Sequence, residues 1–369
     1  MRVAIDTGPL TSGHKVRGIG VHTRELLDAL KRVKGKNTEI EEVDFAQKDL
    51  SKYDIAHYQN FHPFFVTLPV SKVAKKSVVT IHDTIPLIYP EQYAAGIKGR
   101  FRYFVQKQRL KNVDAVITIS ETSKKDICRF LGVKPTKVHV AHLAARSIFK
   151  KINSKTQLEE VRKKYKLPKK FVLYVGDINY NKNILTLIKA CKKADVALVI
   201  CGKQAMDIED KGMGLDTLSG PQDWIRFLFN LPHPELAHYE KLVDHFRVNP
   251  KIMRLGFVPD EDLVAIYNLA TLYCQPSYYE GFGLPVLEAM AVGTPVLASK
   301  IQAHVEIAEG VAVFANPKSV KSFTEKIKKL MKDKKFQGEL SKNGLVHTKN
   351  LSWEKTAKKT LDVYKKLNE

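Results

Sequence analysis

The sequence predicts an α/β protein made of two Rossmann-like domains, each built around a parallel sheet. Three observations support this prediction. The chain opens with a strand, a glycine-containing loop and a helix, VAID, TGPLTSGHKVRGIG and VHTRELLDALKRV, which is how a parallel nucleotide-binding sheet usually starts. A similar pattern restarts at KKFVLYVGD, and 369 residues are enough for two domains of ordinary size.

The first half of the chain alternates short apolar runs with helical stretches. Five strands are expected after the opening one, at IEEVDF, DIAHY, SVVTIHD, VDAVITIS and KVHVAHL, and helices at 91–112 and 120–131. A lysine-rich, weakly apolar stretch follows at about 150–170. We therefore predict an N-terminal domain over residues 1–166.

The second half repeats the pattern with different residues. Strands are expected at KKFVLYVGD, VALVICG, IMRLGFV, TLYCQPS and PVLAS, with helices at NILTLIKACKKA and EDLVAIYNLA, which gives a C-terminal domain over 167–348. The tail places Trp353, Ala357 and Tyr364 at helical spacing. Residues 349–369 are therefore expected to form a terminal packing helix.

The charge of the chain is strongly positive, with 61 basic and 39 acidic side chains and a formal net charge of +22. Such an excess attracts polyanions, which include nucleic acid, an anionic bilayer and phosphorylated small molecules. It does not choose among them.

The cysteines and the apolar runs bear on the cellular location of the protein. Cys128, Cys191, Cys201 and Cys274 form no Cys-x-x-Cys pair, so buried reduced thiols and a cytoplasmic location are expected, without a metal site. No stretch reaches the roughly 18 apolar residues of a membrane span, and the N-terminus lacks the apolar core of a signal peptide.

The stretch YYEGFGLPVLEAMAVGTPVLAS, from Tyr278 to Ser299, combines features of a ligand site. It follows a predicted strand, and in open parallel sheets ligands bind beyond the carboxyl ends of the strands. Gly281 and Gly283 let the backbone approach a ligand, and Pro285 suits the first turn of a helix. The backbone N–H groups at such a helix start favour an anion or a row of ligand hydroxyls.

Two carboxylates, Glu280 and Glu288, flank this helix start. We expect them roughly 10 Å apart, a span that suits two sugar rings with a diphosphate between them. The alternative is that Glu288 only complements the helix dipole and Glu280 is a solvated loop acid. The agreement of two glycines, a proline and two acids favours the ligand site.

E-G-F-G-L-P-V-L-E, followed by A-M-A-x-G-x-P-V-x-x-S, resembles the E-x7-E signature of the retaining nucleotide-sugar glycosyltransferases of family 4. RGIG, VVTIHDTIPL, DAVITISETSKKDI, YVGDINYNKN and SWEKTA resemble other parts of that family in the expected order. The resemblance implies the GT-B fold, in which two Rossmann-like domains face a cleft and the C-terminal helix returns to the N-terminal, acceptor-binding domain. The C-terminal domain would bind the nucleotide-sugar donor.

The resemblance also implies residue roles. Glu280 would contact the transferred hexose, Glu288 the ribose, and Lys182 the diphosphate leaving group, while His82, followed by Asp83, would lie near the hexose and the acceptor. The donor-binding residues expected besides Glu288 are Gly18, Gly20, Gly176, Asn181, Lys203, Val258, Phe282, Gly283 and Leu284. Same-face attack of the acceptor makes neither glutamate a nucleophile, and no cofactor or metal is expected.

The chain departs from the family beside Lys182. The family usually has an Arg next to that Lys or just after the preceding glycine, where this chain has Asn181 and Asp177. Either Lys203 or Arg17 could replace the missing cation.

Two aromatic segments have two interpretations each. Residues 97–111, IKGRFRYFVQKQRLK, carry six basic residues and no acid. They form either a basic amphipathic helix on anionic lipid, which would suit a polyprenyl-linked acceptor, or a core-facing aromatic stripe with a solvated basic back. The segment 223–239 is either a contact surface or an insertion that packs on its own domain.

The sequence therefore predicts a metal-independent, retaining glycosyltransferase of a mannosyltransferase-like branch. It would move a hexose, best mannose from GDP-mannose, to a glycan or lipid-linked saccharide, with a UDP-hexose as the alternative donor. A basic nucleic-acid-binding protein on a Rossmann-like scaffold and a related sugar-nucleotide epimerase are the competing hypotheses. We expect no nucleic-acid partner, and a cytoplasmic location with peripheral contact at the inner face of the membrane.

Overall fold

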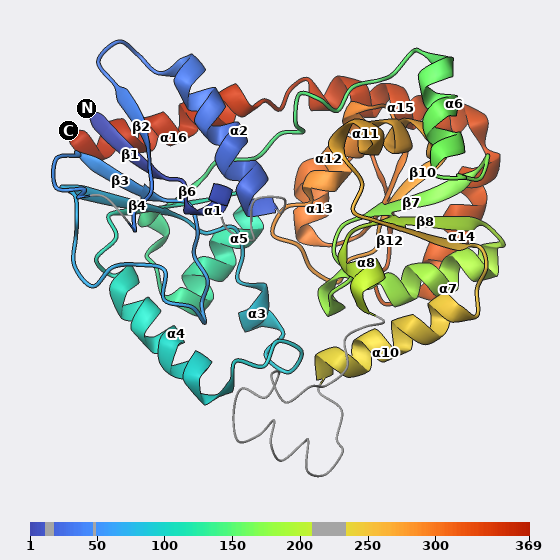
Figure 1. Ribbon diagram of the computed structural model, residues 1–369, viewed down its shortest axis with the longest axis horizontal. Coiled ribbons are helices and arrows are strands. Elements are labelled where there is room, and N and C mark those ends of the chain that lie inside the picture. The colour runs from blue at the N-terminus through green and yellow to red at the C-terminus, as the bar shows by residue number, and fades with distance from the viewer. Residues whose placement is uncertain (12–17, 47–48, 209–233) are drawn as a thin grey trace. The chain divides into compact units, whose positions relative to one another are not determined.

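A computed structural model describes residues 1–11, 18–46, 49–208 and 234–369 of the protein (Figure 1). The chain forms two compact units. Unit 1 contains Met1–Ala144 and Leu351–Glu369, and unit 2 contains Ala145–Asn350. Both units have parallel sheets with helices on both faces, as the sequence predicts.

Unit 1 is built on a parallel sheet with the strand order β2-β1-β3-β4-β5-β6 in its described residues. Its strands are short and mostly buried, because helices cover both faces. They are β1 (Arg2–Asp6), β2 (Glu39–Val43), β3 (Ile55–Tyr58), β4 (Lys76–Thr80), β5 (Ala115–Thr118) and β6 (Val138–Val140).

The helices of unit 1 lie in two layers: α2 and α16 pack together on one face of the sheet, and α4 and α5 lie on the other (Figure 1). Ser352 caps α16 by accepting a hydrogen bond from the backbone N–H of Lys355, and Trp353, Ala357 and Tyr364 are buried. The α-helices are α1 (Gly8–Thr11), α2 (Gly18–Val33), α3 (Ile85–Ile88), α4 (Gly96–Leu110), α5 (Glu121–Asp126) and α16 (Trp353–Asn368).

Unit 2 has a second parallel sheet with the strand order β12-β11-β10-β7-β8-β9 in its described residues. The central strands β7, β10 and β11 are almost entirely buried. The strands are β7 (Phe171–Val175), β8 (Ala197–Cys201), β9 (Ile252–Gly256), β10 (Leu272–Gln275), β11 (Val296–Ser299) and β12 (Val313–Ala315).

Helices also cover both faces of the second sheet. In α7, Ile184, Leu187, Ile188 and Cys191 follow helical spacing and enter the core, where α7 packs against α14. On the other side α11 packs against α6, and α12 against α15. The α-helices are α6 (Lys155–Lys164), α7 (Ile184–Ala194), α8 (Gln204–Asp207), α10 (Pro234–Arg247), α11 (Asp260–Leu269), α12 (Leu284–Ala291), α13 (Gln302–Ala308), α14 (Val320–Lys332) and α15 (Lys334–Thr348).

The division between the units differs from the predicted boundary at residue 166. It falls between Ala144 and Ala145, because α6, in the stretch that we expected to link the domains, packs against α11 of unit 2. In the sequence of α6 the many lysines outnumber its apolar residues, of which Val161 is buried. The terminal helix α16 belongs to unit 1.

Candidate functional site

The stretch with the two carboxylates, Tyr278–Ser299, forms the loop after β10, then α12 and β11. The loop turns at Gly283, whose φ of 111° lies in the left-handed region. A Cβ atom there would lie 3.1 Å from Cδ2 of His304 and 3.2 Å from Cδ1 of Ile307. Position 283 therefore requires glycine, and the helix begins directly after it with its positive end beside the loop.

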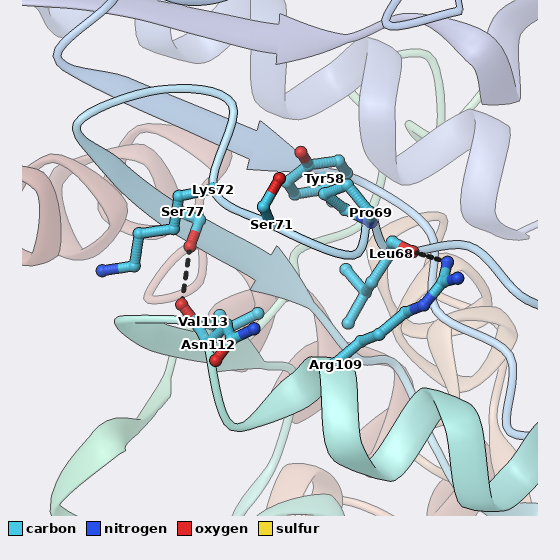
Figure 2. Close-up of a pocket in the computed structure, with 9 residues that line it drawn as sticks. All are labelled: Tyr58, Leu68, Pro69, Ser71, Lys72, Ser77, Arg109, Asn112 and Val113. Atoms are coloured by element: carbon cyan, nitrogen blue, oxygen red, sulfur yellow. Dashed lines mark hydrogen bonds between the residues drawn. The ribbon is translucent and has the colours of Figure 1, made fainter.

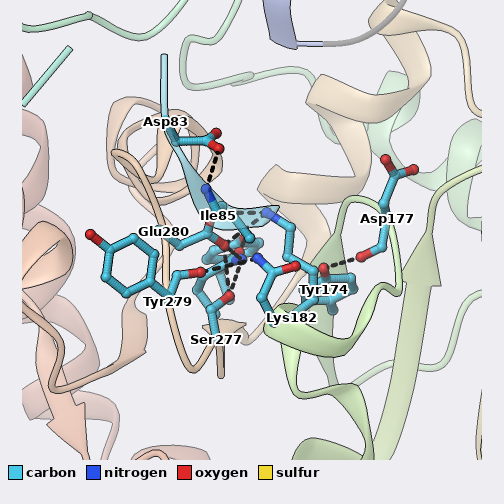
Figure 3. Close-up of polar contacts among 11 residues, drawn as sticks. Asp83, Ile85, Tyr174, Asp177, Lys182, Ser277, Tyr279 and Glu280 are labelled. Atoms are coloured by element: carbon cyan, nitrogen blue, oxygen red, sulfur yellow. Dashed lines mark hydrogen bonds and ion pairs between the residues drawn. The ribbon is translucent and has the colours of Figure 1, made fainter. Parts of the chain in front are cut away.

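Glu280 lies in this loop as a buried carboxylate that accepts hydrogen bonds from several side chains (Figure 3). The Nζ atom of Lys182 donates to both carboxylate oxygens, at 2.9 Å and 2.8 Å. Gln275 Nε2 and Ser277 Oγ also donate to Oε1, at 2.8 Å and 2.7 Å. The interpretation of Glu280 as a solvated loop acid is therefore wrong.

The ion pair with Lys182 keeps Glu280 charged. Burial alone would raise the pKa of Glu280, but the ammonium of Lys182 and the donated hydrogen bonds hold it below its ordinary value. Oε2 accepts from Lys182 and, like any carboxylate oxygen, has a second lone-pair direction. The arrangement can therefore hold a ligand hydroxyl on Glu280 and an anion on Lys182 together.

The turn before α7 fixes the position of Lys182. Asn183 adopts a φ of 55°, and its Nδ2 atom donates to the backbone oxygens of Pro276 and Pro317, both at 2.8 Å. Asn181 is buried, and its Nδ2 atom donates to the backbone oxygen of Tyr279 at 3.1 Å. The two asparagines thus join the Lys182 turn to the Glu280 loop, and Asn181 serves as a brace between them.

Gly176 follows β7, as predicted, and comes close to the end of β8. Its N–H donates to the backbone oxygen of Cys201 at 2.9 Å. A Cβ atom on Gly202 would lie 2.2 Å from the backbone oxygen of Gly176, so Gly202 is required as glycine for this close approach.

Glu288 lies inside α12 and pairs with a different cation, Arg146. The guanidinium donates from Nε to Glu288 Oε1 at 3.1 Å and from Nη1 to Asp260 Oδ2 at 2.8 Å. Tyr267 donates its hydroxyl to Glu288 Oε2 at 3.4 Å. Burial raises the pKa of Glu288 above its ordinary value, while Arg146 and Tyr267 offset part of that rise.

The remaining predicted donor residues of unit 2 lie in other loops and helix starts than Glu280 and Glu288, or beside them in sequence. Val258 is buried between β9 and α11, and Phe282 is buried in the loop beside Gly283. Leu284 is half-buried at the first position of α12, and Lys203 is exposed just before α8. Arg17, the other candidate for the missing cation, lies outside the described residues.

The predicted residues of unit 1 lie at the start of α2 and after β4. Gly18 and Gly20 are in the first turn of α2, whereas we expected them in the loop before the helix. The ring of His82 lies edge-on to that of buried His22, with 4.7 Å between centroids. Asp83 accepts a hydrogen bond from the backbone N–H of Ile85 at 3.1 Å and so holds the start of α3 (Figure 3).

A pocket in unit 1 is too small to hold a substrate (Figure 2). It lies between the loop at Leu68 and the end of α4, where Arg109 donates to the backbone oxygen of Leu68 at 2.6 Å. Its volume is about 10 Å³, which is about what one water molecule requires. Within the described residues there is also no cluster of three His, Cys, Asp or Glu side chains suited to a metal ion.

Several polar residues near the two carboxylates of unit 2 were not predicted from the sequence. Gln275 and Ser277 flank the end of β10 at alternate positions, a signal that could have identified them as partners of Glu280. Arg146 stands 142 residues before Glu288 and has no motif around it. His304 is buried beside Gly283, and burial lowers its pKa to about 4, so it is neutral at pH 7.

Two family models match the chain. The model described as "Glycosyl transferases group 1" matches residues 157–347, and that described as "Glycosyltransferase Family 4" matches residues 41–144. The matched ranges together contain Lys182, Glu280, Glu288 and His82.

Curated relatives with similar sequences include bacterial mannosyltransferases. The O-antigen chain mannosyltransferase B of Escherichia coli is 29% identical over 88% of this chain and 77% of its own length. The serotype-specific mannosyltransferase WbdA of Escherichia coli is 28% identical over 82% of this chain. The chain covers only 35% of WbdA.

Solved structures share the fold. Sucrose-phosphate synthase from Thermosynechococcus elongatus matches with a TM-score of 0.67 and 20% identity over 100% of this chain and 99% of its own. HepE from Anabaena, solved with UDP and glucose, matches with a TM-score of 0.66 and 14% identity over 99% and 100%. WaaG, a glycosyltransferase involved in lipopolysaccharide biosynthesis, matches with a TM-score of 0.63 and 13% identity over 98% and 99%. The predicted GT-B fold class is thus confirmed.

Proposed function

Because this chain belongs to the glycosyl transferases group 1 family, we propose that it transfers a hexose from a nucleotide sugar to a glycan or a lipid-linked saccharide. The observation that carries the proposal is the pair Lys182–Glu280 at the carboxyl end of β10, beside the N-terminus of α12. It offers a cation for a leaving diphosphate and a carboxylate for a sugar hydroxyl in one rigid group.

Mannose from GDP-mannose is the donor that we propose. Two curated relatives are named mannosyltransferases and align over more than four fifths of this chain. A UDP-hexose is the second candidate, because the similar HepE structure contains UDP and glucose. Val258 is a buried apolar residue and carries no side-chain group that would select the base.

In the proposed mechanism Lys182 and the N-terminus of α12 stabilise the negative charge of the departing diphosphate. Glu280 holds a hexose hydroxyl, and Glu288 holds the ribose with its charge maintained by Arg146. We propose retention by same-face attack, in which the acceptor hydroxyl passes its proton to the departing phosphate. The saturated hydrogen bonding of Glu280 Oε1 suits a positioning role and not that of a nucleophile.

The reaction is proposed to need no metal, since Lys182 and the helix dipole supply positive charge where the leaving group forms. His82 and Asp83 are proposed to act near the hexose and acceptor, and Gly18 and Gly20 near the donor phosphate. A cytoplasmic location is supported by the four free cysteines, three of which are buried.

A donor screen tests the proposal. GDP-, UDP- and ADP-sugars are added to the wild type, to Lys182→Met and to Glu288→Gln, and the shift in melting temperature is measured. The exposed positions Lys335→Met and Glu339→Gln serve as matched controls in unit 2. We expect GDP-mannose to stabilise the wild type and both controls, but neither site variant; no shift with any donor would contradict the proposal.

The stereochemistry and metal requirement are tested with the donor so identified. The anomeric configuration of the product, measured by NMR, is expected to match that of the donor. Turnover is expected to persist in EDTA. An inverted product or complete loss of turnover in EDTA would contradict the proposed mechanism.

A further inference from the structure

The helix α4 of unit 1 carries three large apolar side chains on its outer side, while Leu110 at its end enters the core. Ile97, Phe101 and Phe104 are 65%, 69% and 59% exposed and lie one turn apart along a single face. The interpretation of this segment as a core-facing aromatic stripe is therefore wrong for these residues. The helix thus has a second apolar face, which is exposed, besides the side on which Tyr103 and Leu110 pack against the core.

Polar bonds hold the inner side of α4 on unit 1. Gln106 is fully buried, and its Nε2 atom donates to Thr67 Oγ1 at 2.8 Å. Tyr103 donates its hydroxyl to the backbone oxygen of Phe130 at 2.6 Å, and Arg109 donates to Leu68. The orientation of the helix is thus fixed, so the apolar face cannot turn inward without breaking these bonds.

A neighbouring loop extends this apolar face. Phe65 is 57% exposed, and the guanidinium of Arg102 from α4 lies 5.8 Å from the centre of its ring. Phe65, Phe101 and Phe104 are three of the four exposed phenylalanines in the described part of the chain. We name Phe65, Ile97, Phe101 and Phe104 together the α4 face.

The surroundings of the α4 face are basic. Lys98, Arg100 and Arg102 are all exposed and lie between its apolar residues in sequence. The helix contains no acidic residue. Exposed aromatic rings among exposed basic residues match the boundary between acyl chains and anionic headgroups, where rings enter the apolar layer and cations remain at the surface.

We propose that the α4 face docks unit 1 on an anionic lipid bilayer, with the Phe65, Phe101 and Phe104 rings inserted and Lys98, Arg100 and Arg102 at the headgroups. The contact is peripheral: no described helix combines the length and the apolar character that crossing a bilayer demands. The inference rests on the proposed function only through its lipid-linked acceptor, which such docking would bring within reach.

Sedimentation with vesicles tests the apolar part of the inference. The full chain, without donor or acceptor, is mixed with vesicles of phosphatidylcholine alone or with phosphatidylglycerol. We expect binding only to the anionic vesicles, reduced about tenfold or more in Phe101→Ser/Phe104→Ser. The matched control Phe257→Ser/Val346→Ser removes two exposed apolar residues of unit 2 and is expected to bind like the wild type.

A second pair of variants separates a local site from the general charge of +22. Lys98→Gln/Arg100→Gln/Arg102→Gln is compared with Lys358→Gln/Lys359→Gln/Lys365→Gln, which removes the same charge from exposed positions of α16. Only the first is expected to weaken vesicle binding about tenfold or more.

The outcomes are distinct. Equal losses in the two charge variants, unchanged binding of the serine variant, or no binding to anionic vesicles would overturn the inference. So would a dimer, measured by sedimentation equilibrium, that the serine variant abolishes. Because the assay uses no nucleotide, loss of vesicle binding with an intact GDP-mannose shift removes only this inference, and the reverse result removes only the proposed function.

Discussion

At the scale of single residues, the Lys182–Glu280 pair shows how a buried charge depends on its partner. Lys182→Met leaves Glu280 as a buried carboxylate without its cation, which typically costs about 3–5 kcal/mol. We expect the free energy of unfolding, measured with urea at pH 7, to fall by about that amount.

The double variant Lys182→Met/Glu280→Gln provides the control for this loss. It removes the unpaired charge, so part of the lost stability is expected to return. The idea is wrong if the double variant is as unstable as the sum of the two single variants, since that would indicate independent packing defects.

Arg146 gives a second prediction, which concerns binding and not stability. Without the guanidinium, burial dominates at Glu288, so its pKa rises further and more of it is protonated near neutrality. Arg146→Met should therefore bind the nucleotide more weakly at pH 6 than at pH 8, by titration calorimetry. A loss of equal size at both pH values would show that Arg146 does not act through the charge of Glu288.

At the scale of elements, the carboxyl ends of β7 and β8 depend on the absence of a side chain at Gly202. Gly202→Ala forces a Cβ atom against the backbone oxygen of Gly176, so the strand ends must move, and we expect a loss of about 2 kcal/mol or more. Gly338→Ala in α15 is the control, because open space surrounds it and alanine favours helix by about 0.5–1 kcal/mol. Thermal unfolding of both variants measures the difference.

The helices and strands also explain why much of the fold was predictable from the sequence. The central strands of both sheets, such as β3, β5, β7 and β10, are short buried runs of mainly apolar residues, and such runs are visible in the sequence. The helix α6 was not predicted because its exposed lysines dominate its composition, and the short strand β12 was not predicted either, although β6, of the same length, was. The orientation of α4 was not predictable. The spacing of its apolar residues shows that they share one face of the helix, but not whether this face turns toward the core or toward solvent.

The candidate site was predictable only where its residues are close in sequence. Glu280, Gly283 and Glu288 share one motif, and the geometry of that motif follows from a strand, a turn and a helix. Arg146 is distant in sequence and joins Glu288 only through the folding of unit 2. Long-range pairs of this kind have no local pattern, so structure was needed to find them.

At the scale of the whole molecule, buried histidines in both units tie stability to pH. Burial lowers the pKa of His57 in unit 1 to about 3 and that of His304 in unit 2 to about 4. His57 also shares hydrogen bonds with the hydroxyls of Thr80, at 2.8 Å, and of Tyr364 on α16. Both rings are therefore neutral in the folded chain over a range in which an unfolded histidine, with a pKa of about 6.5, takes up a proton.

This difference fixes the sign of the pH dependence. Between pH 6.5 and about 4 the unfolded state binds more protons than the folded state. The contribution of the two neutral rings to stability is therefore fully present above pH 6.5. It falls as the pH is lowered, by up to about 1.4 kcal/mol per pH unit for each ring. Below about pH 4.5 the Lys182–Glu280 pair adds to the loss, because the lowered pKa of Glu280 makes its protonation unfavourable in the folded state. Urea unfolding at pH 7, 6 and 5 is expected to show this decline, with a shallower slope in His57→Gln. An unchanged slope in that variant would show that the pKa of His57 is not lowered in the folded chain.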